Sequence, residues 1–491
     1  MPTIEQIAAA LQGYDPQALP AASVNEFLAR LVEPVTATEA VGVFAALGRV
    51  LAQDVISPIS VPPHDNSAMD GFAFDGALLR PGEPLTLRLA AGTAFAGKAW
   101  SGPLAVDQCV KIMTGAIMPA GLDTVVPLEF VKIDGEQVTL PAHVLQRGDN
   151  RRLLGEDLMA GRPALHRGQT LGPAALGLIA SLGLPQVNVF RRLKVAYFST
   201  GDEILSLGEP PREGAVYDSN RYTVFGLLTR LGVEVIDMGV VKDEPAALEA
   251  AFRQAAAQAD AIITSGGVSM GEADHTKAMM KQLGDVAFWR IAMRPGRPMA
   301  VGRISTDACG EARFAAGPPQ GESAPPGGSA PRAAGSVGAV FAAGPPQGES
   351  APPGGSAPSV SPPAAASRGA AGSVGAILFG LPGNPVAVMV TFLAFVRPAL
   401  QRLMGCNASE PVLLKARSAE ALRKKPGRTE YQRGIVTRAA DGTLHARTTG
   451  NQGSGVLRSM VQANGLIVLH HGQGSVAVGD EVDVMMFDGV I

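Results

Sequence analysis

Apolar positions between residues 191 and 405 follow two periods in turn, one typical of strands and the other of helices. Short apolar runs at 195–199, 233–241 and 261–264 predict buried strands. Between them, apolar residues return at helical spacing over 220–231 and 244–257. This alternation predicts an α/β domain at 191–405, built on a doubly wound parallel sheet.

The flanking regions have other patterns. Residues 1–55 contain helical segments at 23–32 and 38–51, and 151–190 return to a helical pattern, with a helix from Pro173 to a stop near Gly183 and then a strand. We therefore expect 1–55 and 151–190 to form one discontinuous linker domain. Residues 56–150 predict a β-rich inserted domain with strands at 85–89 and 124–128, and 406–491 a small C-terminal β-barrel or sandwich. The predicted fold class is α/β with additional β domains.

A duplicated low-complexity segment interrupts the α/β pattern. Residues 314–331 recur unchanged at 341–358 and are rich in Pro, Gly, Ala and Ser. Such a composition buries too little apolar surface to offset the entropy of ordering, so 306–375 is predicted to be a disordered surface insertion. Apolar runs at 299–304 and 376–379 predict the strands on either side. The alternative is a tether for a partner.

Composition narrows the class of protein. Of 491 residues, 46% are hydrophobic and 17% charged, and the net charge of −3 argues against nucleic-acid binding. The three cysteines are far apart, which indicates a reducing compartment without structural zinc. The N-terminus lacks a signal-peptide pattern. The apolar run at 386–396 is shorter than the ~20 residues of a membrane span. We therefore expect a cytoplasmic protein that is not embedded in a membrane.

The glycine-rich turn after the 261–264 strand is the strongest local signal. Ser265-Gly-Gly precedes a helix for which Asp274 is a natural N-cap and Gly284 a natural C′ residue. Such a turn lets backbone N–H groups approach an anion. It is neither a Walker loop nor a dinucleotide fingerprint. The acidic residues that follow the glycines suggest a divalent cation beside the anion.

Other polar residues follow other strand ends, where ligands bind in open α/β sheets. Glu203, Asp243 and Asp274 are predicted to share one rim, and Asn384-Pro385 suits the start of a helix. Helix capping is the alternative role for Asp243, Asp274 and Asn384. Three arginines in one short segment suit a phosphate, although a solvated basic surface would have the same spacing; they are Arg290, Arg294 and Arg297.

Taken together, these segments resemble the molybdopterin molybdenumtransferase family, the MoeA-like proteins and the gephyrin E domain. The matching segments occur in the family's order and cover the chain except for the insertion; they are 65–71, 112–116, 152–157, 198–203, 217–221, 265–274, 295–298, 381–385, 426–428 and 452–454. The resemblance implies a four-domain homodimer that takes adenylylated molybdopterin and molybdate, releases AMP with the help of Mg²⁺, and leaves molybdenum on the dithiolene. Other cofactor-biosynthesis proteins and recipient molybdoenzymes would be its further partners.

The resemblance also implies roles for individual residues. Asp70 and Thr114 would reach the active-site cleft from the partner subunit, with Asp157 at its rim. Glu203, Asp243 and Asp274 would hold the metal ion or orient the attacking group. The remaining positions would bind substrate: Ser265, Gly266, Gly267, Ser269, Arg290, Arg294 and Arg297 the pterin phosphate, Pro382, Asn384 and Pro385 the pocket wall, and Arg428 and Ser454 the molybdate. Where this chain has the three arginines, family members can carry lysine, which changes hydrogen-bond geometry.

Two other functions remain open on the sequence. The α/β domain and its Gly-Gly-Val-Ser loop are shared with enzymes that adenylylate molybdopterin with ATP, although segment 65–71 and the C-terminal β domain belong to the insertase type. A scaffold that clusters partners is the non-enzymatic alternative, which the proline-rich insertion favours and the acidic rim residues oppose.

Overall fold

The α/β domain is built on one six-stranded sheet. The computed structural model describes residues 2–268, 275–305, 375–407 and 411–487. The strand order is β16-β13-β17-β21-β20-β18, and the first four strands are parallel. The strands are β13 (Lys194–Thr200), β16 (Glu234–Val241), β17 (Ala261–Ser265), β18 (Gly284–Arg290), β20 (Pro298–Ile304) and β21 (Ala376–Leu381).

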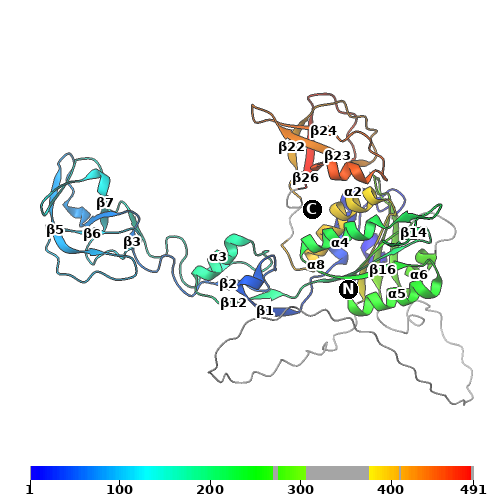
Figure 1. The fold of residues 1–491 in the computed structure, drawn as a ribbon, viewed down its shortest axis with the longest axis horizontal. Helices are drawn as coiled ribbons and strands as arrows, with labels where there is room; N and C mark the ends of the chain where they lie inside the picture. The colour runs from blue at the N-terminus through cyan, green and yellow to red at the C-terminus, as the bar shows by residue number, and fades with distance from the viewer. Residues whose placement is uncertain (1, 269–274, 306–374, 408–410, 488–491) are drawn as a thin grey trace, which may run out of the picture. The chain divides into compact units, whose positions relative to one another are not determined.

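Helices cover both faces of this sheet, because successive strand residues point to opposite sides. Val195, Tyr197 and Ile263 face a core that includes α4 (Ser219–Leu231) and α7 (Pro385–Thr391). Ala196, Phe198 and Ile262 face a second core under α5 (Pro245–Gln258) and α6 (His275–Leu283). Figure 1 shows α5 and α6 beside each other. The doubly wound α/β prediction is therefore confirmed.

One edge of the sheet differs from the all-parallel prediction. β20 pairs antiparallel with β21, and β18 pairs antiparallel with β20. Gly284 is not the left-handed C′ residue that the sequence predicted. It begins β18 directly after α6, opposite Ile304, where a Cβ would lie 2.0 Å from the Arg303 carbonyl oxygen. Glycine is required here for a close approach of two strands and not for a helix cap.

The N-terminal helices pack against the α/β domain. Helices α1 (Ile4–Ala9) and α2 (Ala21–Leu31) share a hydrophobic core with α8 (Arg397–Leu403) and β18. Phe27 meets Trp289 edge to face with 4.8 Å between ring centroids, and the Trp289 indole donates a hydrogen bond to the Tyr14 hydroxyl.

The predicted helix at 38–51 is wrong. Thr38–Gly42 forms strand β1, which pairs antiparallel with β12 (Gln186–Phe190), and a short 3-10 turn, η1 (Val43–Ala46), follows. The backbone of this segment pairs with a strand nearly 150 residues away, and no local sequence pattern reports such a partner. Strands β2 (Val55–Ile56) and β11 (Pro163–Leu165) also pair, and α3 (Pro173–Ser181) packs with them. The 151–190 region is thus less helical than its pattern suggested, although the Pro173 helix start and the Gly183 stop are confirmed.

The β-rich region contains a six-stranded sheet in the order β7-β4-β6-β5-β9-β8. Figure 1 shows β5, β6 and β7 in it. Its strands are β4 (Gly71–Phe74), β5 (Leu85–Ala94), β6 (Gln108–Ile112), β7 (Thr124–Pro127), β8 (Lys132–Asp134) and β9 (Gln137–Leu140); a small ladder joins β3 (Asn66–Ser67) to β10 (Arg151–Arg152), and the 3-10 turns are η2 (Gly76–Leu78) and η3 (Leu128–Phe130).

The C-terminal region closes into a five-stranded barrel, as predicted. Strand β23 pairs with both β24 and β25, and the ring continues through β22 and β26. Residues Met293–Arg294 of the α/β domain form β19, which adds to β23. The elements are β22 (Leu414–Ser418), β23 (Thr429–Arg438), β24 (Leu444–Thr448), α9 (Leu457–Gln462), β25 (Gly465–Leu469) and β26 (Glu481–Met486); two short strands, β14 (Ile204–Leu205) and β15 (Val216–Tyr217), pair elsewhere.

The apolar run at 386–396 lies in a longer helix than its sequence suggested. Helix α7 continues through a π turn, η4 (Phe392–Val396), into α8, so the helix spans Pro385–Leu403. By length and composition it could cross a membrane, but 72% of its apolar window is buried inside the protein. It packs as a core helix against α2 and α4.

Candidate functional site at the strand ends

Two glycines make the turn after β17. Gly266 and Gly267 have φ values of +92° and +65°. A Cβ on Gly266 would lie 2.3 Å from the Thr200 carbonyl oxygen, and one on Gly267 would lie 2.4 Å from Thr276 Cβ. Both positions therefore require glycine for backbone conformation and for space. The turn packs closely against the end of β13 and the first turn of α6.

The Ser265 hydroxyl is engaged inside the protein. Ser265 is 2% exposed, and its Oγ lies 2.7 Å from the Tyr197 hydroxyl and 3.2 Å from Ser199 Oγ. Burial raises the pKa of Tyr197 far above its ordinary value, so the phenol stays protonated and joins β13 to β17 by hydrogen bonds. The Ser265 side chain thus holds the turn in place.

Asp243 is tied to the helix that follows the turn. Thr276 Oγ1 donates to Asp243 Oδ1 at 3.1 Å. Asp243 was a candidate cap for α5, but Glu244 holds the N-cap position and no side-chain cap is made, so that alternative is wrong. The exposed Glu203 follows β13, and its carboxylate lies over Gly201, where a Cβ would meet Glu203 Oε2 at 2.5 Å. Asp274 and Ser269 lie outside the described residues.

The chemistry of this rim suits a hard cation. Carboxylate oxygens are the ligands that Mg²⁺ prefers, and Asp243 Oδ2 makes no hydrogen bond to a described residue. Among the residues that the structure describes, no group of three His, Cys, Asp or Glu side chains is arranged to hold a metal ion. The predicted metal ligands are Glu203, Asp243 and Asp274. Asp274 lies outside the described residues, so the structure shows only the other two.

The three arginines lie near the join between sheet and barrel. Arg290 ends β18, Arg294 lies in β19 beside Glu430 of the barrel, and Arg297 precedes β20; all three side chains are exposed. Between them, Gly296 has φ +89°, and a Cβ there would lie 2.4 Å from Thr391 Oγ1. None of the three forms an ion pair with a described carboxylate, so their charges are available to an anion.

A second contact joins the α/β domain to the barrel. Asn384 holds the N-cap position of α7, and Pro385 follows at N1 as predicted. The Asn384 side chain makes no cap, which corrects that alternative; its Nδ2 donates to Ser454 Oγ at 3.1 Å, and Val386 N donates to the Ser454 carbonyl oxygen at 3.2 Å. Pro382 is buried and lies shortly before α7.

Arg428, in the barrel, is part-exposed. Its side chain bonds to the buried Glu430 at 2.7 Å.

Asp70 and Thr114 meet in the β-rich domain. Asp70 Oδ1 accepts from the Thr114 N–H at 2.6 Å and from its hydroxyl at 2.7 Å. These bonds hold the pKa of Asp70 below its usual range, so the carboxylate is charged at neutral pH. Asp157 is exposed near β10. No hydrogen bond or ion pair among the described residues joins Asp70, Thr114 or Asp157 to the rim.

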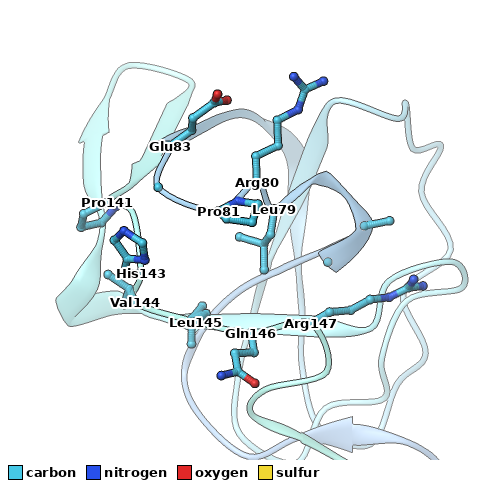
Figure 2. Close-up of a pocket in the computed structure, with 13 residues that line it drawn as sticks. Leu79, Arg80, Pro81, Glu83, Pro141, His143, Val144, Leu145, Gln146 and Arg147 are labelled. Atoms are coloured by element: carbon cyan, nitrogen blue, oxygen red, sulfur yellow. The ribbon is translucent and has the colours of Figure 1, made fainter.

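The β-rich domain also has a pocket of about 460 Å³. Figure 2 shows its lining from two segments, within 76–83 and 141–147, with Arg80, His143 and Arg147 among the side chains. None of the residues predicted for the site lines it, so we do not assign the chemistry to this pocket.

Comparisons with known proteins identify the family of this chain. Three family models match in order: the MoeA N-terminal region (domain I and II) at 22–183, a probable molybdopterin binding domain at 196–402, and the MoeA C-terminal region (domain IV) at 415–487. A molybdopterin molybdenumtransferase of Haemophilus influenzae is 35% identical, over 93% of this chain and 95% of its own. The chain belongs to the MoeA family.

Further members support the family and its fold. A molybdopterin molybdenumtransferase of a Nostoc species is 33% identical over 91% of this chain and 88% of its own. Two crystal structures of MoeA proteins from Pyrococcus horikoshii each match 96% of this chain. One has a TM-score of 0.63 at 25% identity over 99% of the solved chain. The other has a TM-score of 0.68 at 22% identity over 100% of the solved chain.

Sequence reasoning missed several residues that shape the site of this MoeA-family chain. Thr276 fixes Asp243, Tyr197 holds Ser265, and Arg433 holds the loop that carries Ser454. Thr276 follows a predicted N-cap residue, and Arg433 sits in an alternating strand pattern, so neither was marked by spacing. The buried polar neighbours of Ser265 and Ser454 are visible only once the strands are paired.

Proposed function

We propose that this chain inserts molybdate into adenylylated molybdopterin and releases AMP, as an enzyme of molybdenum cofactor biosynthesis. The observation that carries the proposal is the contact of Asn384 with Ser454, which brings the strand-end rim of the α/β domain to the anion-suited side chains of the barrel. A site with both parts fits a substrate with phosphate groups and a separate oxyanion. The Haemophilus relative is named a molybdopterin molybdenumtransferase, which supports the transfer of molybdenum to molybdopterin.

The chain's own residues suit cleavage of a phosphoanhydride by positioning and charge. The Gly266–Gly267 turn brings backbone close to the substrate phosphates, and Arg290, Arg294 and Arg297 supply positive charge. Glu203, Asp243 and Asp274 would hold Mg²⁺, which neutralises phosphate charge when bound. Asn384, Arg428 and Ser454 would orient molybdate. No Ser–His or Cys–His nucleophile is required, because positioning and charge are the main catalytic contributions.

The active form in this proposal is a homodimer. Asp70, Thr114 and Asp157 have no described contact with the rim of their own chain, so we propose that they complete the site of the partner subunit. We propose that the partner subunit also covers Phe44 and Leu47, which are 99% and 52% exposed beside β1. We place the reaction in the cytoplasm, in keeping with the free thiols of Cys109 and Cys406.

The test is AMP release from adenylylated molybdopterin with Mg²⁺, with and without molybdate. Molybdate-dependent release, together with active cofactor, is the expected result. Consumption of ATP with free molybdopterin would make the chain an adenylyltransferase instead. A lack of turnover in both assays would contradict an enzyme and favour a scaffold.

A further inference from the structure

A buried arginine lies under the loop that carries Ser454. Arg433, in β23, is 1% exposed and is among the largest fully buried side chains of the protein. Its Nη2 donates to the carbonyl oxygens of Asn451 at 3.2 Å and Gly453 at 2.9 Å, and its Nε donates to Ser459 Oγ at 2.9 Å. Its backbone also exchanges two hydrogen bonds with the Gln452 side chain. One residue therefore holds the whole 451–453 loop.

The charge of Arg433 has no described counter-charge. No carboxylate among the described residues forms an ion pair with it, and Glu430 of the same strand pairs with Arg428. Burial, and then the charge of Arg294, lower the pKa of Arg433 to about 10, which still leaves it protonated at neutral pH. A buried cation without a carboxylate is costly, and an anion bound nearby would reduce that cost.

The bonds to Arg433 also fix the direction of the loop. The peptide bonds of this loop are trans, so the N–H that follows each carbonyl points the opposite way. Because the carbonyls of Asn451 and Gly453 turn toward Arg433, the N–H groups of Gln452 and Ser454 turn away from it. Neither N–H donates to a described residue. Backbone N–H groups that converge on one side of a turn form a concave site for an anion.

We propose that Arg433 is a positioning residue for molybdate: it orients the Gln452–Ser454 loop so that the Ser454 hydroxyl and the N–H groups of Gln452 and Ser454 face the oxyanion. The inference rests on the proposed function for the identity of the anion. Arg433 is buried and acts through the loop, so it is not a catalytic residue.

The test is molybdate binding to the full chain, measured by calorimetry without molybdopterin. Arg433→Lys keeps the charge but cannot make the two-armed contact. We expect it to weaken molybdate binding roughly tenfold, the effect of losing hydrogen bonds to a charged group. Arg433→Met is expected to weaken binding further. Arg438→Met, at an exposed position of the same strand, is the matched control and is expected to bind like the unaltered protein.

Thermal unfolding identifies any variant that fails to fold. If Arg433→Met does not fold, the comparison rests on Arg433→Lys. The double variant of Arg433→Lys with Ser454→Ala separates positioning from general packing. If Arg433 acts by positioning this loop, the two substitutions are not independent, and the double variant loses less affinity than the product of the two single losses. Effects that multiply, or a folded Arg433→Lys protein with unchanged binding, would overturn the inference, as would a lack of molybdate binding by the unaltered protein. Molybdate binding without AMP release would instead count against the proposed function alone.

Discussion

At the scale of single residues, the two glycines of the strand-end turn allow a direct test. Gly266→Ala places a Cβ 2.3 Å from the Thr200 carbonyl oxygen at φ +92°. We expect a loss of about 1–3 kcal/mol in stability, because backbone strain and the clash add, and a marked fall in AMP release. Gly226→Ala in α4 is the control: its Cβ meets nothing within 4 Å, so stability should stay or rise. Equal effects from the two substitutions, in thermal unfolding and in turnover, would contradict a special role for the turn.

The charge of Asp243 and its hydrogen bond to Thr276 can be tested separately. Asp243→Asn keeps an oxygen for Thr276 and removes the charge, whereas Thr276→Val removes the hydroxyl and keeps the charge. If Asp243 holds Mg²⁺, Asp243→Asn should lower turnover roughly a hundredfold and raise the Mg²⁺ concentration needed for half-maximal rate. Thr276→Val should retain most activity. The reverse order in a Mg²⁺ titration would assign Asp243 to structure.

The role of a residue was predictable from sequence where it depends on neighbours that are close in the chain. Gly266 and Pro385 occupy the positions that their turn and helix signals indicated. Asn384 also holds its predicted N-cap position but makes no cap, because its side chain bonds to Ser454, 70 residues away, and not to the backbone of its own helix. Arg433 could not be chosen from sequence, since its partners become neighbours only when the barrel closes.

At the scale of elements, an ion pair joins α4 to β16. Arg221 bonds to both oxygens of Asp237, and the two groups are about a quarter and a third exposed. Burial raises the pKa of Asp237, but the Arg221 bonds and the Gly239 N–H outweigh it, so the pKa is lowered. A lowered carboxyl pKa stabilises the fold above the unfolded value of about 3.9, and this stability is lost as pH falls through the folded pKa.

Asp237→Asn is therefore expected to cost about 0.5–1 kcal/mol at pH 7, after allowance for solvent screening, and progressively less as the pH falls below about 4. Unfolding followed by Trp289 fluorescence, with Trp100→Phe to remove the other tryptophan, reports on the α/β core. Glu249→Gln, in the exposed Arg253 pair on α5, is the control and should cost less. A cost that is the same at pH 7 and at acid pH would exclude the ion pair as its cause.

Helices and strands were predicted correctly where the elements that they pack against are close in sequence. The alternation of strands and helices at 191–265 was correct because each helix packs on strands adjacent to it in the chain. The strand at Thr38–Gly42 was missed because its partner begins at Gln186. The antiparallel edge of the sheet was missed for a related reason: β20 and β21 are neighbours in space but are separated by the 306–374 segment in sequence.

At the scale of the whole molecule, that segment offers a test by deletion. Ile304 pairs with Ala376 in antiparallel strands, so Ser305 and Gly375 stand at the end of one ladder. Replacement of residues 306–374 by Asn-Gly, which favours a two-residue hairpin turn, should connect β20 to β21 without strain. We expect unchanged thermal stability and unchanged AMP release. Loss of folding would mean that the segment contributes to the core, and loss of activity in a folded protein would give it a part in the reaction.

Shared sites between subunits can be tested by complementation. Asp70→Asn keeps an oxygen for both Thr114 donors, so it should fold; it and Asp243→Asn are each expected to be nearly inactive as homodimers. If Asp70 completes the partner's site, a mixed dimer holds one site with both substitutions and one intact site. Random assembly of equal amounts should then restore about a quarter of the unaltered activity. If Asp70 and Asp243 belonged to a site within one chain, every site in the mixture would carry one substitution, and no activity would return. Differently tagged subunits, purified in tandem, would isolate the mixed dimer and give about half activity in the first case.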